Sequence, residues 1–126
     1  MKPMRKYFER TLLLGAFCAL GVLFAHEEPK GKAITVTGEV IDTGCYVAHG
    51  GHGADHATCA ATCAKNGVPL AILDASGKIY MPIAADHKNQ NAKLMPFIEK
   101  KVKVSGTLLE KGGFTGIAIK TIEAAD

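Results

Sequence analysis

The sequence predicts a mainly β protein, a small five-stranded barrel with one or two short helices. Two observations support this prediction: three segments alternate apolar with polar residues while two more flank a hairpin turn, and a glycine stands at matching points in two of the alternating segments. Alternation with a period of two places apolar side chains on one face of a strand, as in a half-buried sheet. The length of 126 residues suits one domain with a modest core.

The five expected strands are residues 33–42, 70–73, 78–81, 101–110 and 114–123. In the first of them, Ile34, Val36 and Val40 fall on one face. The second and third flank Asp-Ala-Ser-Gly, which is typical of a hairpin, and Lys-Gly-Gly turns the chain between the last two. Residues 87–100 predict a short helix that Pro96 interrupts.

Residues 36–41 and 104–109 share the order Val, hydroxyl, Gly, polar, aliphatic, aliphatic. Glycine inside a strand normally weakens it, so Gly38 and Gly106 predict sharp bends or bulges, which a small closed barrel needs. The order of strand, hairpin, helix and two strands, with the first and fourth strands bent at glycine, resembles the OB-fold. Over residues 33–123 the chain looks like small exported bacterial OB-fold-like proteins. The resemblance implies the barrel and leaves the function open.

The first 25 residues have the features of a secretory signal peptide. A basic start precedes an uninterrupted apolar run of 14 residues, 12–25, and the chain then turns polar. We expect cleavage after Ala25, a polar linker over 26–32 and the barrel domain over 33–126. The run is shorter than the ~20 residues that span a bilayer, so no stable membrane insertion is expected after cleavage. The mature protein is then periplasmic or secreted; an uncleaved membrane anchor is the alternative.

The charge distribution disfavours a nucleic-acid partner. Of 15 basic and 12 acidic residues, four basic and one acidic lie in the first 25, so the remainder carries eleven of each and no net charge. Single-strand binding by such barrels needs a basic groove and aromatic stacking platforms, and the chain has no Trp. We therefore expect no nucleic-acid binding.

The chemistry of the sequence is concentrated in one insertion, residues 43–67. It holds every cysteine beyond the signal peptide and three of the five histidines. These six candidate ligands are Cys45, His49, His52, His56, Cys59 and Cys63. Thiolate and imidazole are the ligands that copper and zinc ions prefer, so the cluster predicts a soft-metal site.

An Ala-rich helix is expected over residues 55–66, with Asp55 capping its start and Asn66-Gly67 ending it. On such a helix His56, Cys59 and Cys63 fall within an arc of about 60°, so three donors face one way. Cys45 can fold over as the fourth ligand. His49 and His52 are second choices, because the Gly-rich loop that carries them has no fixed direction.

Two other functions remain open at this stage. Exported proteins meet oxidising conditions, so Cys45 could pair with Cys59 or Cys63 in a structural disulfide that leaves one thiol over, within a partner-binding module. A thiol–disulfide redox protein is the third possibility and the only catalytic candidate, since no other catalytic constellation is visible and no enzyme is expected. The expected partners are a metal ion and a protein that exchanges metal or thiols with this one.

Overall fold

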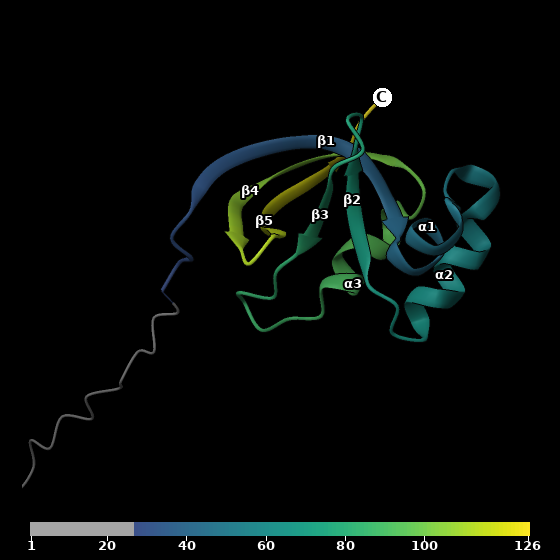
Figure 1. Ribbon diagram of the computed structural model, residues 1–126, viewed down its shortest axis with the longest axis horizontal. Coiled ribbons are helices and arrows are strands. Elements are labelled where there is room, and N and C mark those ends of the chain that lie inside the picture. Colours follow the sequence, from purple (N-terminus) through teal and green to yellow (C-terminus); the bar gives the residue numbers. More distant parts are fainter. Residues whose placement is uncertain (1–26) are drawn as a thin grey trace, which may run out of the picture.

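The computed structural model describes residues 27–126. The expected signal peptide and its cleavage after Ala25 lie outside the described residues. Within them five strands close into a barrel in the order β1-β2-β3-β5-β4 (Figure 1). The strands are β1 (Lys32–Asp42), β2 (Leu70–Asp74), β3 (Ile79–Pro82), β4 (Lys101–Lys111) and β5 (Phe114–Ala124). The prediction of a small, mainly β barrel with short helices is confirmed.

Short helices fill the two long connections of the barrel. They are α1 (Thr43–His49), η1 (Ala54–His56), α2 (Ala57–Lys65), α3 (Gln90–Leu94) and η2 (Met95–Phe97). Figure 1 shows α1 and α2 together at one side of the barrel, with α3 beneath the strands. The described residues thus contain three α-helices, and α1 occupies residues for which no helix was predicted. None of the helices in this part of the chain is long and apolar enough to cross a membrane.

The long strand β1 pairs antiparallel with two neighbours and so curves around the barrel. Its first part pairs with β4, its last part with β2, and Gly38 and Glu39 pair with both. The barrel closes where β3 and β5 run parallel, with Met81 opposite Gly116. The core inside it is aliphatic. Its fully buried side chains include Val40, Leu70, Ile72, Leu94, Val102, Val104 and Ile117.

The two glycines predicted to bend their strands sit where a side chain would strike the neighbouring strand. A Cβ atom at Gly38 would meet the carbonyl oxygen of Leu73, and one at Gly106 would meet that of Ala118. The pairing of β4 with β5 also shifts register between Ser105 and Gly106. The prediction of a bulge is confirmed at Gly106, and at Gly38 the absence of a side chain lets β2 approach closely.

The helix expected over 55–66 begins later than predicted. Asp55 lies inside the 3-10 turn η1, and α2 begins at Ala57 with no side chain capping its first turn. The prediction that Asp55 caps this helix is therefore wrong, because the 3-10 turn that contains Asp55 runs directly into α2. The predicted end is confirmed, since Asn66 follows α2 and Gly67 has a φ of 93°. The interruption by Pro96 is confirmed too: α3 ends at Leu94 and Pro96 lies in η2.

Candidate metal centre

The site is built at the point where β1 ends and α1 begins. Asp42 caps α1, because its Oδ1 accepts hydrogen bonds from the backbone N–H groups of Gly44 at 2.8 Å and Cys45 at 3.3 Å. The Thr43 N–H donates to the carbonyl of Pro69 at 3.1 Å, which ties the start of α1 to the chain just before β2. These bonds fix Cys45 in the first turn of a short helix.

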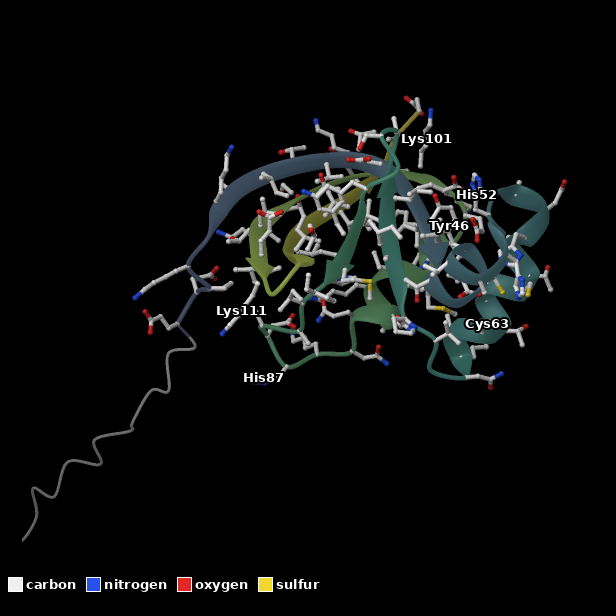
Figure 2. The ribbon with its side chains drawn as sticks, in the orientation of Figure 1. Tyr46, His52, Cys63, His87, Lys101 and Lys111 are labelled. Atoms are coloured by element: carbon white, nitrogen blue, oxygen red, sulfur yellow. The ribbon has the colours of Figure 1, made fainter. Side chains whose placement is uncertain are left out.

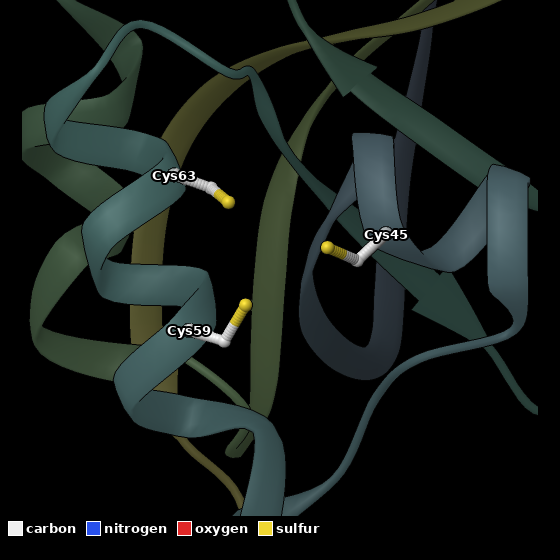
Figure 3. Close-up of side chains that lie close together, drawn as sticks. All are labelled: Cys45, Cys59 and Cys63. Carbon is white, nitrogen blue, oxygen red and sulfur yellow. The ribbon is translucent and has the colours of Figure 1, made fainter.

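The other two cysteines come from α2. Ala60 and Ala64, one turn apart, are buried and pack this helix onto the barrel core. The small alanine side chains let α2 approach closely, and Cys59 and Cys63 then lie on the adjoining face. Figure 3 shows both sulfur atoms pointing across the gap between the helices toward that of Cys45.

The three cysteines form one donor group. Their Sγ atoms all lie within 4.8 Å of one another, close enough to hold a metal ion. Cys59 is exposed while Cys45 and Cys63 are half-buried, so the group lies at the surface with one open side. All three are free thiols, and residues 27–126 contain no disulfide between them.

A second donor group shares Cys45 with the first. It consists of Asp42, Cys45 and His56, whose ligand atoms also lie within 4.8 Å of one another. Asp42 is fully buried. Its Oδ2 lies 3.9 Å from His56 Nε2, too far for a hydrogen bond, and both atoms are buried without a hydrogen-bond partner. A buried polar atom in this state is costly, so the pair requires an explanation.

The Asp42 carboxylate controls the protonation of the neighbouring thiols. Interaction with this carboxylate, and to a lesser extent burial, raises the pKa of Cys45 to about 12. The same two causes raise the pKa of Cys63 above its ordinary value. Burial acts to raise the pKa of Asp42 itself, but the Cys63 and Cys45 thiols and the backbone N–H groups lower it overall. Without metal these two thiols are therefore protonated at neutral pH, and a metal ion must displace their protons.

The three histidines of the insertion differ in position. His56 lies in η1, ahead of α2, and groups with Asp42 and Cys45 instead of joining Cys59 and Cys63 in one set. His49 is the exposed last residue of α1. His52 lies near Tyr46 (Figure 2), with the two rings edge-on and their centroids 5.6 Å apart, and its Nδ1 lies 3.1 Å from Glu39 Oε2. Neither His49 nor His52 belongs to a described donor group.

Sequence reasoning missed Asp42 as a site residue. It was taken as the last residue of the first strand, which it is. An Asp ahead of a short run without proline is also a signal for a helix N-cap, and this signal could have indicated α1. Its carboxylate reaches the thiols only because α1 turns back over the end of the strand.

A pair of carboxylates lies nearby, formed by Glu39 of β1 and Glu99 of the segment before β4. Glu99, whose φ is 54°, is buried and its Oε2 accepts a hydrogen bond from the Gly53 N–H at 2.8 Å. Burial, together with the adjacent Glu39, raises the pKa of Glu99 to about 7. Glu39 and Glu99 each keep one buried oxygen without a hydrogen-bond partner. The two carboxylates fasten the Gly-rich loop before η1 to the barrel.

The comparisons with known proteins give no relative on which a function could be based. No family model matches the chain, no curated protein matches it, and no solved structure matches its fold. The resemblance to exported OB-fold-like proteins therefore stays a prediction. The function has to be argued from the donor groups alone.

Proposed function

We propose that this is an exported protein that binds a soft metal ion, copper or zinc, through Cys45, Cys59 and Cys63. The observation that supports it is the convergence of three sulfur atoms from two helices to within 4.8 Å. Thiolate is the donor that Cu⁺ and Zn²⁺ prefer, and three such donors at one point are a chemically coherent set.

The surroundings suit a bound ion that is taken up and released. Cys59 is exposed, so an ion can reach the sulfur atoms from solvent or from a partner protein. The backbone that holds Cys45 is anchored by the Asp42 cap, and Ala60 and Ala64 hold the backbone of the other two cysteines. Ligands on anchored helices lose little freedom on binding, which favours affinity.

A thiol–disulfide function is less well supported by the same geometry. The attacking species in disulfide exchange is the thiolate, and a reactive cysteine has a lowered pKa. The pKa values of Cys45 and Cys63 are raised here, beside a buried carboxylate. These two thiols are therefore poor nucleophiles at neutral pH.

The test is a titration of the reduced protein with Cu⁺ against a chromophoric chelator, repeated with Cys59→Ser and Cys63→Ser. We expect each variant to lose most of the affinity. Thr62→Ser is the matched control, since Thr62 is exposed on the same helix and bonds only within it. Equal and weak binding by the wild type and both cysteine variants would refute a metal function for these thiols. A rapid thiol exchange assay would then examine the redox alternative.

A further inference from the structure

The three-sulfur group leaves two buried atoms unexplained. Asp42 Oδ2 and His56 Nε2 face each other at 3.9 Å, and neither makes a hydrogen bond. Asp42 is fully buried, and the side chain of His56 is 16% exposed. A carboxylate oxygen of Asp42 and a ring nitrogen of His56 lie within 4.8 Å of each other and of the Cys45 sulfur.

From this arrangement we infer a second metal position, formed by Asp42, Cys45 and His56, that takes a divalent ion of the Zn²⁺ class. It shares the Cys45 sulfur with the three-sulfur position, so the centre holds two ions bridged by one thiolate. The inference rests on the proposed function, because Cys45 belongs to both positions.

The donor chemistry differs between the two positions. The first offers sulfur alone, whereas the second offers one oxygen, one sulfur and one nitrogen. Zinc accepts all three ligand types, with bonds of about 2.0–2.2 Å to nitrogen and oxygen. A tetrahedral ion with such bonds separates its nitrogen and oxygen ligands by about 3.4 Å. The observed 3.9 Å between Oδ2 and Nε2 therefore needs only a small contraction.

The charges of the ligands also favour two ions. Three thiolates and the Asp42 carboxylate together carry four negative charges, and two divalent ions neutralise them. Cys45 is suited to bridging because it is the one member that the two groups share.

The position of His56 also supports the assignment. The η1 turn that carries it begins after Gly53, whose N–H is held by the Glu99 carboxylate at 2.8 Å. The His56 ring passes close to Gly51, where an added Cβ would lie 3.4 Å from its Cε1 atom. The ring is thus confined between the loop and the end of β1, with its Nε2 directed toward Asp42.

The test counts Zn²⁺ ions on the reduced full chain by native mass spectrometry. We expect two ions on the wild type and one on His56→Ala. Asp42→Asn should also hold one, because the amide oxygen can still cap α1 while the charge of the ligand is lost. His49→Ala, which removes an exposed imidazole of the same insertion, is the control and should keep two. Thermal melts of each variant show whether it is folded.

Each other outcome has a definite meaning. One ion on the wild type and on His56→Ala, lost in Cys59→Ser, would overturn the second position and leave the proposed function standing. If the wild type bound one ion and both His56→Ala and Cys59→Ser bound none, His56 and the cysteines would form a single four-ligand site. This result too would overturn the inference. A loss of one ion in His49→Ala would show adventitious binding at exposed imidazoles. No ion on the wild type would overturn both proposals.

Discussion

Two carboxylate–imidazole pairs join β1 to the insertion, and they differ in separation, burial and neighbouring groups. Glu39 Oε2 lies 3.1 Å from His52 Nδ1, within hydrogen-bond distance, whereas Asp42 Oδ2 lies 3.9 Å from His56 Nε2. The first pair is partly exposed and has a carboxylate neighbour in Glu99. The second has a buried carboxylate and thiol neighbours.

The difference separates a structural contact from a candidate ligand set. In the closed pair Glu39 Oε2 and His52 Nδ1 are within hydrogen-bond distance of each other, and this contact ties the loop to the barrel. An open, buried pair leaves both atoms unsatisfied, which is unfavourable unless another group binds there. Soft sulfur donors lie beside only the open pair. The two carboxylates, Glu39 and Asp42, are three residues apart on β1, yet only the second is placed to bind a metal ion with the thiols.

The largest effect is expected from Cys45→Ser. The Cys45 sulfur belongs to both donor groups, so its loss should lower the affinity for Cu⁺ by more than about 100-fold, beyond the 10–100-fold that loss of an outer-shell partner typically costs. Competition with a chelator measures this. His87→Asn is the control, because His87 lies on the loop between β3 and α3, away from the cysteines (Figure 2). A similar loss in His52→Ala would contradict the distinction between the two pairs.

Gly38→Val should destabilise β1, the strand that carries the carboxylates of both pairs. The new side chain would meet the Leu73 carbonyl oxygen and lie about 2.9 Å from Ile72 Cγ2. We expect the free energy of unfolding to fall by more than the ~1 kcal/mol range of strand propensities, as measured by denaturant titration. Thr37→Val, at the exposed neighbouring position, controls for the choice of side chain. If Gly38→Val left the free energy of unfolding unchanged, the close approach of β2 to Gly38 would be refuted.

Glu99→Gln should stabilise the protein in a pH-dependent way. The pKa of Glu99 is raised from 4.5 to about 7 in the folded state, mainly by burial. As the pH rises from 4.5 to 7, Glu99 loses its proton in the unfolded chain before it does so in the folded protein. The free energy of unfolding of the wild type therefore falls over this range and stays reduced above pH 7. Glutamine cannot ionise and still accepts the Gly53 N–H.

The melting temperature of Glu99→Gln should therefore exceed that of the wild type at pH 8 by about 4 °C or more, the shift that ~1 kcal/mol gives in a small domain. At pH 4 the two proteins should melt at nearly the same temperature. A difference that is constant between pH 4 and pH 8 would show that Glu99 is not the titrating group.

The smallest effect is expected from His52→Ala. The pair with Glu39 is partly exposed, and pairs of this kind contribute ~0.2–1 kcal/mol. The free energy of unfolding should fall by no more than that, and the count of bound Zn²⁺ ions should not change. Loss of an ion in this variant would place His52 among the ligands and would remove the contrast between the closed and open pairs.

Local patterns in the sequence were enough to predict most of the strands of the barrel. Strands such as β1 and β4 alternate over part of their length because they bury one face there, and this period is visible without any partner strand. The bulge at Gly106 and the end of α2 before Gly67 were also predicted, because glycine serves a local backbone need at each. By contrast, α1 was missed. It forms because Asp42 caps its start and Gly50, with a φ of 69°, ends it, within a segment whose glycines suggest a loop.

The sequence by itself determined the strands, their glycine bends and the concentration of thiols and imidazoles in residues 43–67, since each is a matter of composition and short-range period. Only the tertiary structure decided which donors meet. It brought Cys45 of α1 to Cys59 and Cys63 of α2, and it grouped His56, in the η1 turn, with Asp42 and Cys45 instead. The physical reason is that contact between donors depends on the angle between elements. That angle is fixed by long-range packing, such as Ala60 and Ala64 on the barrel core, which no local pattern records.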